Sequence, residues 1–162
     1  MTEHRLQERS IDPMLKELKV DIIAFKLHDQ DFCVDTTSVR EIRGWGKSTP
    51  IPHAPPEVLG VMTLRGNVIP IIDLAAKLGM QPVDNSDRSA IVVAEIGETI
   101  IGLVMDGVTD LVTIDRQAVQ PLPETTRHGQ AFSHGIITHD IGMICYLDLE
   151  SLFADADLAL AA

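Results

Sequence analysis

A repeated unit is the feature of this sequence that most constrains its fold. Residues 61–74 (VMTLRGNVIPIIDL) contain two apolar runs that are separated by a turn signal and followed by Asp-Leu. About 75 residues later, residues 135–149 (GIITHDIGMICYLDL) show the same order of features. A repeated supersecondary unit indicates two similar subdomains. Each would hold only about 60 to 70 residues, too few for a large core of its own, so we expect two small barrels packed side by side.

The chain from Val20 onward consists of short runs rich in β-branched residues, a pattern typical of an all-β barrel or sandwich. Turn residues separate the runs, and Gly66 and Gly107 are expected to supply the positive φ of tight turns. Pro70 has no N–H, so its strand is expected at a sheet edge or beside a bulge. The predicted strands are Val20–Leu27, Phe32–Val34, Val39–Trp45, Val61–Leu64, Val68–Ile72, Ala90–Ile96, Thr99–Met105, Leu111–Ile114, Gly135–Thr138 and Ile141–Leu147.

Two helices are predicted from their capping residues. Asp73 can cap a helix over residues 74–78 that Gly79 ends, and Asp148 can cap a C-terminal helix with one apolar stripe. The charged N-terminus is expected to be a flexible arm. The predicted organisation is an arm over residues 1–19, one domain over 20–153 with two intertwined barrel subdomains at about 20–80 and 88–147, and a C-terminal helix over 148–162.

The charge of the chain makes two classes of partner unfavourable. The 162 residues include 13 basic and 24 acidic side chains, which gives a net charge of −11. This excess disfavours binding to nucleic acid or to an anionic membrane surface. No apolar run approaches the roughly 18 residues that span a bilayer, and residues 1–19 lack the apolar stretch of a secretory signal. We expect a cytoplasmic protein without direct membrane insertion, whose partners are other proteins.

The polar residues show no pattern of a catalytic or metal site. The six histidines lack the spacing of zinc ligands, and there is no nucleophile elbow, phosphate-binding loop or dinucleotide fingerprint. Cys33 and Cys145 lie in predicted strands. They could form one bridge, although a reducing cytoplasm favours two buried free thiols. We therefore expect no enzymatic activity, no cofactor and no metal.

Two charged residues stand beside apolar strand positions. Arg65 lies at a hairpin apex, and Glu41 begins the segment Glu41–Trp45, which holds the only tryptophan. Arg65 could be a solvated turn cation and Trp45 a partly buried core aromatic. Alternatively, Glu41 and Arg65 pair and hold two hairpins in register beside a docking surface, for which the planar donors of arginine are well suited.

Three segments have a recognisable order and spacing: residues 32–45, residues 60–74 with a Leu-Arg-Gly motif, and residues 102–111. They resemble the signatures of the CheW family, the coupling proteins of bacterial chemotaxis, for which the Leu-Arg-Gly motif is specific, although Thr63 stands where an Asn is usual. Order and spacing fit from about Val20 to Phe153. The resemblance implies an all-β fold with short helices, in which two five-stranded SH3-like barrels share an apolar core. It also implies a non-enzymatic adaptor.

The resemblance further implies the partners and the residues that meet them. The partners are the cytoplasmic tip of a chemoreceptor, the regulatory domain of the histidine kinase CheA, and copies of the chain itself in rings, and receptor arrays would recruit the protein to the membrane. Glu41 is expected to support Arg65. The expected receptor-facing residues are Val39, Arg65, Ser89, Ala90, Ile91, Gly102 and Leu111, and the expected kinase-facing residues are Leu59 and Gly60.

Three other functions stay open. A protein of this family could serve a different kinase array, such as one for twitching motility. A small-molecule-binding or enzymatic barrel could place a site between the subdomains, with His53, His134 and Cys33 as its reactive residues. A purely structural oligomer is the third alternative.

Overall fold

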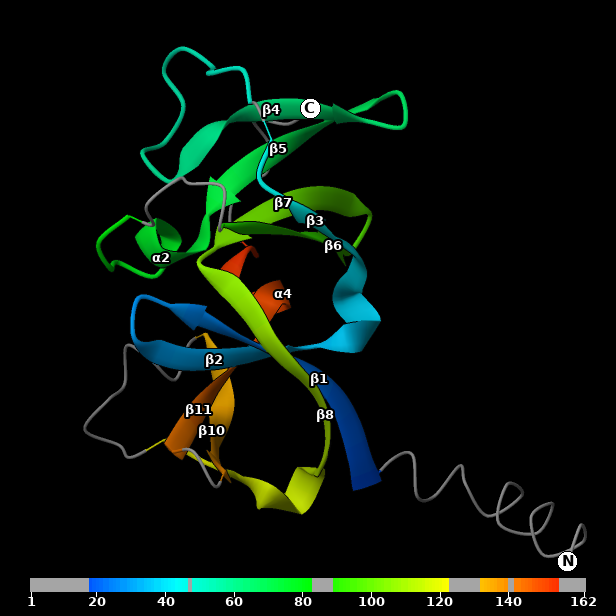
Figure 1. The fold of residues 1–162 in the computed structure, drawn as a ribbon, viewed down its shortest axis with the longest axis vertical. Helices are drawn as coiled ribbons and strands as arrows, with labels where there is room; N and C mark the ends of the chain where they lie inside the picture. The colour runs from blue at the N-terminus through cyan, green and yellow to red at the C-terminus, as the bar shows by residue number, and fades with distance from the viewer. Residues whose placement is uncertain (1–17, 47, 83–88, 123–131, 140–141, 155–162) are drawn as a thin grey trace, which may run out of the picture.

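A computed structural model of the chain describes residues 18–46, 48–82, 89–122, 132–139 and 142–154. Strands dominate these residues, as the sequence predicts, and all ten predicted strands are present (Figure 1). The short strand β9 is additional, because two residues carry no alternation that a sequence pattern can detect. In chain order the elements are β1 (Lys19–Leu27), β2 (Gln30–Asp35), the 3-10 helix η1 (Thr36–Ser38), β3 (Val39–Gly44), β4 (Val58–Leu64), β5 (Asn67–Asp73), α2 (Leu74–Lys77), β6 (Ala90–Ile96), β7 (Thr99–Met105), β8 (Gly107–Asp115), the 3-10 helix η2 (Arg116–Ala118), β9 (Val119–Gln120), β10 (Ser133–His139), β11 (Gly142–Leu147) and α4 (Leu149–Leu152).

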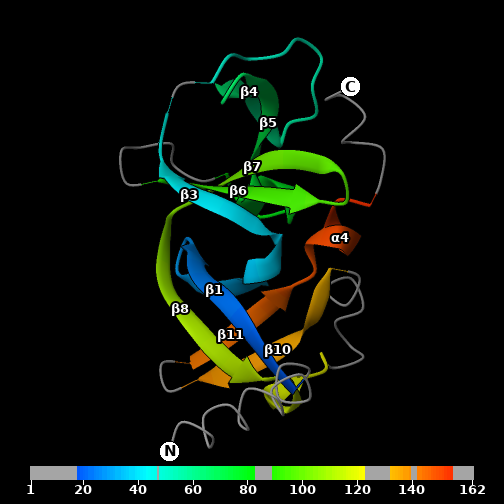
Figure 2. The same cartoon turned by 90° about the vertical axis from the view of Figure 1, so that its right-hand side faces the viewer.

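The strands form two sheets that lie one above the other, with α4 between them (Figures 1 and 2). One sheet has five strands in the order β3-β6-β7-β5-β4. The other has six, in the order β8-β1-β2-β11-β10-β9, because β9 adds a strand to the expected five. The expected all-β fold with short helices is therefore confirmed.

The two halves of the chain exchange hairpins. The β1–β2 hairpin lies in the middle of a sheet whose other strands, β8 to β11, all come from the second half. Reciprocally, the β6–β7 hairpin lies among β3, β4 and β5 of the first half. Four strand pairs join the halves: β1 with β8 and β3 with β6 are antiparallel, whereas β2 with β11 and β5 with β7 are parallel. Each sheet thus takes strands from both of the segments 20–80 and 88–147.

The main hydrophobic core fills the space between the sheets. It contains Phe25 and Leu27 of the six-stranded sheet and Leu103 and Met105 of the five-stranded sheet, each at most 1% exposed. The helices α2 and α4 add further apolar side chains to this core. One smaller cluster lies on the outer side of each sheet. The two clusters comprise Leu64, Ile69, Ile71, Ile91, Val93 and Val104 in the five-stranded sheet, and Val20, Ile22, Ala24, Cys33, Ile137, Ile144 and Tyr146 in the six-stranded sheet.

Both helices begin at the predicted capping residues. A carboxylate oxygen of Asp73 accepts the Ala76 N–H at 3.1 Å, and one of Asp148 accepts the Ser151 N–H at 3.3 Å. The C-terminal helix is shorter than predicted, because α4 covers four residues and Phe153 takes the C-cap position. Residues 155–162 of the expected helix and residues 1–17 of the expected arm lie outside the described residues.

Three local predictions have different outcomes. Gly66 has φ +84°, as expected for its tight turn. The prediction of positive φ at Gly107 is wrong, because this glycine starts β8 where the chain crosses to the other sheet. The edge-strand alternative for Pro70 is also wrong, since β5 pairs with both β4 and β7. The bulge alternative is confirmed: the β4 register shifts between Val58 and Gly60, and β7 pairs with β5 only from Ile71 onward.

Glycine is required at the same place in each repeat. Gly60 (φ +154°) lies where the backbone of Thr49 crosses β4, and a Cβ there would lie 2.3 Å from the Thr49 carbonyl oxygen. Gly135 (φ +144°) lies where β9 crosses β10, and its Cβ would lie 2.3 Å from the Gln120 carbonyl oxygen. These two close backbone crossings show that the repeat in the sequence is a repeat in the structure.

We expect Gly60→Ala and Gly135→Ala each to lower the free energy of unfolding by more than about 2 kcal/mol, because both the positive φ and the crossing backbone oppose a Cβ. Gly44→Ala is the matched control, since its Cβ would meet no atom within 4 Å, and it should change the free energy by less than about 0.5 kcal/mol. Urea unfolding of the three variants and the parent measures this. Equal midpoints for all four proteins would contradict the role of the crossings.

Candidate interaction surface

An ion pair joins the two edges of the five-stranded sheet. Arg65 occupies the β4–β5 turn with φ +51°, and its Nη2 donates to Oε2 of Glu41 on β3 at 2.9 Å. Since β3 and β4 are the opposite edges of this sheet, the pair brings its ends into contact. The predicted Glu41–Arg65 pair is therefore confirmed. The Arg65 side chain is 76% exposed, so the pair contributes at most about 1 kcal/mol to stability, and its main effect is to fix positions.

The Glu41 carboxylate lies between two guanidinium groups. Its Oε2 accepts from Arg65, while Oε1 lies 3.7 Å from Nη1 of Arg43. Oε1 is buried and makes no hydrogen bond within the described residues. A single nitrogen of Arg65 bonds the carboxylate, rather than two nitrogens in a fork. The Arg65 guanidinium therefore keeps donors free of Glu41 on an exposed turn.

Three aliphatic side chains continue the main core to the surface, and we call Val39, Ile42 and Leu111 the aliphatic strip. Val39 packs against the main core. Ile42 pairs with Val92, and Leu111 pairs with Ile23, both buried in that core. Side chains of directly paired residues share a face of the sheet, so Ile42 and Leu111 lie on the core-facing sides of the edge strands β3 and β8. They are 43% and 65% exposed.

A β-bulge explains why the strip includes Ile42, which the sequence analysis did not select. The register of β3 with β6 shifts between Val39 and Glu41. Because Arg40 is the extra residue, Val39 and Ile42 share a face although they are three positions apart. Arg40 itself pairs with Glu95 through Nε at 2.8 Å. A strict two-residue alternation places Ile42 on the opposite face from Val39, so this pattern could not detect it.

Three of the expected receptor-facing residues lie inside the protein. Ser89 is 3% exposed, Ile91 is 1% exposed, and Gly102 is buried where a Cβ would lie 2.7 Å from Cδ1 of Ile71. Ala90 is half-buried and its backbone pairs with Gly44 at the end of β3. These residues lie in or next to β6 and β7, the interior strands of their sheet, and offer little or no contact area. Of the seven expected residues, Arg65 and Leu111 are well exposed.

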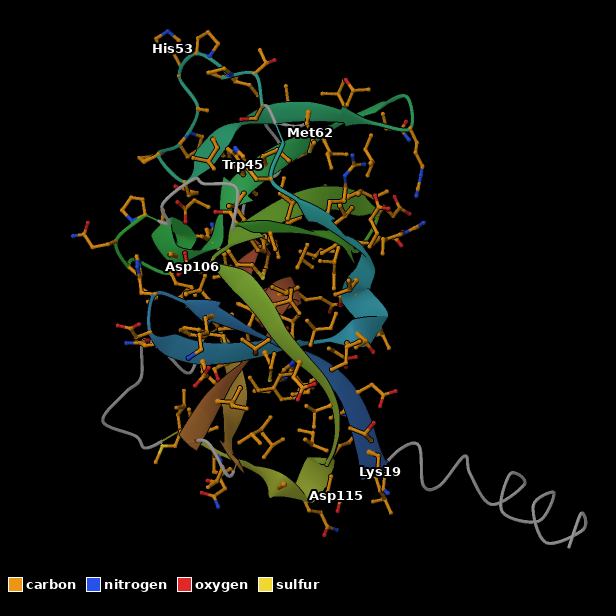
Figure 3. All side chains as sticks on the ribbon, viewed as in Figure 1. Lys19, Trp45, His53, Met62, Asp106 and Asp115 are labelled. Atoms are coloured by element: carbon orange, nitrogen blue, oxygen red, sulfur yellow. The ribbon has the colours of Figure 1, made fainter. Side chains whose placement is uncertain are left out.

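The expected kinase-facing residues lie at the β4 bulge. Leu59 is half-buried and packs against the outer cluster of the five-stranded sheet, together with Trp45 and Met62. Figure 3 shows Trp45 and Met62 at this end of the molecule. Gly60 is buried beneath the backbone of Thr49, so it permits the crossing segment to approach and offers no side chain to a partner.

The residues of the alternative reactive site do not come together. His53 lies at the far end of the five-stranded sheet, in an exposed loop before β4 (Figure 3), whereas Cys33 and His134 lie in the six-stranded sheet. Cys33 is fully buried, and burial, helped by Cys145 and Asp35, raises the pKa of its thiol to about 12. Burial also raises the pKa of Cys145. Both cysteines are free thiols.

A polar pocket of about 260 Å³ lies between η1 and the start of α4. Of its lining residues, His134 packs against the Tyr146 ring at a tilt of 53° with ring centroids 4.5 Å apart, and Asp35 accepts a hydrogen bond from the Tyr146 hydroxyl at 3.3 Å. The described residues contain no group of three or more His, Cys, Asp or Glu side chains placed to bind a metal. The lining residues are Asp35, Thr37, Ser38, His134, Leu147, Asp148, Leu149 and Glu150.

No helix within the described ranges is long and apolar enough to cross a membrane.

The buried Cys33 thiol predicts a loss of stability at alkaline pH. Above the ordinary cysteine pKa of 9.0 the unfolded chain releases this proton, whereas the folded chain keeps it up to about pH 12. Stability therefore falls as the pH rises from 9 toward 12, by at most about 1.4 kcal/mol per pH unit for this group. Urea unfolding of the parent and of Cys33→Ala at pH 8 and at alkaline pH measures the effect. The parent should lose more stability than the variant, and parallel losses would contradict it.

Comparisons with known proteins assign the family. The model of the CheW-like domain matches residues 21–157. A probable chemotaxis protein CheW of Rhizobium etli is 46% identical, over 85% of this chain and 89% of the relative. A chemotaxis protein CheW of Rhizobium meliloti is 42% identical, over 82% of this chain and 86% of the relative. The crystal structure of the scaffolding protein TtCheW from Thermoanaerobacter tengcongensis superposes with a TM-score of 0.76 at 32% identity, covering 84% of this chain and 88% of that one. The chain therefore belongs to the CheW family, the non-enzymatic scaffold proteins of bacterial chemotaxis.

Proposed function

We propose that this chain is a cytoplasmic adaptor that couples the tip of a chemoreceptor to the regulatory domain of the histidine kinase CheA. The observation that carries the proposal is the aliphatic strip on the edge strands β3 and β8. Glu41, which pairs with Arg65, also lies on β3. An exposed apolar surface on a well-packed protein indicates a docking site for another polypeptide. The family of the chain supports the same role.

The strip suits an amphipathic helix of the receptor. Val39 and Ile42 stand on one edge strand and Leu111 on another, so together they can receive the aliphatic side chains that recur on one face of a helix. Arg65 adds exposed donors for a carboxylate or carbonyl group of the receptor. Ser89, Ile91 and Gly102 would act indirectly, by packing in and next to β6 and β7, the strands that position β3 in the sheet.

The β4 bulge suits the kinase contact. Leu59 presents part of its side chain there, and Gly60 lets the Thr49 segment lie close over β4. Leu59 packs against the outer cluster of the five-stranded sheet, whereas Val39 and Ile42 lie on the core-facing side of β3, so receptor and kinase could bind together. Coupling then requires only that binding of the two partners differs between the active and inactive states of the kinase.

Each contact is expected to be small, and many adaptors in one array would add their effects through avidity. Retention of a receptor tip and of the CheA regulatory domain on the immobilised protein tests the proposal. Retention of both partners supports it. Retention of neither at high concentration overturns it, and retention of a partner from another kinase array alone would assign the protein to that array.

Charged substitutions in the aliphatic strip should weaken receptor binding. Ile42→Asp and Leu111→Asp each place a charge on the apolar surface, and we expect at least a tenfold loss of affinity for the receptor tip. Met143→Asp is the matched control, because Met143 is 70% exposed on β11, away from the strip. Titration calorimetry with the receptor tip measures the three affinities. An equal loss in all three variants, or no loss in the strip variants, contradicts the assignment.

Charge reversal at Arg65 should impair coupling with little effect on stability. Arg65→Glu opposes Glu41 and removes the exposed donors, so kinase activation in a reconstituted array should fall several-fold. Arg40→Glu is the control. Arg40 lies on the edge strand β3, is 53% exposed, and pairs with Glu95 of β6 instead of with Glu41. Melting temperatures of both variants should stay within a few degrees of the parent. Parental activation by Arg65→Glu would refute the role.

A further inference from the structure

Among the residues that the structure describes, neither half of the chain pairs all of its strands within itself. Residues 19–82 form the hairpins β1–β2 and β4–β5, and the described pairing of β3 is with β6 of the other half. Residues 89–153 form β6–β7 and the group β9–β10–β11, while β8 pairs with β1. Isolated hairpins are at best marginally stable in water. Each half is therefore completed by the other.

We propose that a second copy of this chain can supply the missing half, so that two chains form a dimer with exchanged halves. In such a dimer, each lobe combines residues 19–82 of one chain with residues 89–153 of the other. All four joining strand pairs and the main core would be the same as in the single chain. The exchange therefore sacrifices no contact that holds the halves together.

The connection between the halves sets when the exchange occurs. Residues 83–88 join Pro82 to Ser89, so the two ends can be at most about 25 Å apart and the two lobes must lie side by side. A short connection gives the two halves of one chain an effective concentration of about a millimolar. The single chain is therefore favoured in dilute solution, and exchange occurs between chains that fold close together. Each dimer would present two complete aliphatic strips.

The test uses full-length variants with lesions confined to one half. The first variant carries Gly60→Val and Ile71→Asp, and the second carries Gly135→Val and Ile137→Asp. The two glycines are crossed by backbone of their own half, and the two isoleucines are at most 2% exposed. Neither variant can form a native lobe from one chain. An exchanged pair has one lobe built from two intact halves and one lobe that holds all the lesions.

The two variants are unfolded, mixed in equal amounts and refolded at micromolar concentration. We expect the mixture to recover about half of the native fluorescence of Trp45, because one lobe of each pair is intact, at twice the mass of one chain. The control mixes the first variant with Phe25→Asp/Ile72→Asp, whose lesions lie in the same half, and should recover no native signal. Failure of the first mixture to exceed this control overturns the proposal, whatever the outcome of the receptor and kinase experiments.

Discussion

The reciprocal insertion of the two hairpins is the constraint on which the rest of this structure depends. The β1–β2 hairpin is held on both sides by strands of the second half, and the β6–β7 hairpin by strands of the first. The main core closes only when both insertions are complete, because its buried side chains come from both sheets and from the helices α2 and α4. Packing between the halves, more than local strand propensity, therefore stabilises each sheet.

The interaction surface follows from the same arrangement. Inserting β6–β7 beside β3 leaves β3 as an edge strand, and inserting β1–β2 beside β8 does the same for β8. Ile42 and Leu111 lie on the core-facing sides of these two edge strands and are exposed to solvent. They are therefore the exposed ends of an otherwise buried apolar layer. The Arg65–Glu41 pair joins the far hairpin to β3. The proposed receptor site thus lies on strands that are positioned by the core.

The sequence predicts the strands, the capping of both helices and the ion pair, because each depends on local chemistry. Asp73 and Asp148 precede apolar helical residues, and Arg65 begins a tight turn with Gly66. It could not predict which half supplies which strand, since hairpin exchange depends on pairing between distant residues. The bulge at Arg40 also leaves no signal in the sequence, so strand alternation does not place Ile42 on the same face as Val39. Burial of Ser89, Ile91 and Gly102 became visible only once β6 and β7 were placed in the interior of their sheet.

The parallel pairing of β2 with β11 has a consequence for synthesis in the cell. Phe32 pairs with Cys145, which is translated 113 positions later. At about 5 to 20 residues per second, the ribosome needs roughly 6 to 23 seconds to make that stretch. Until β8 and then β11 have been made, the β1–β2 hairpin lacks one or both of its flanking strands, and its apolar residues stay accessible to water and to chaperones. Completion of the six-stranded sheet therefore waits until β10 and β11 have been made.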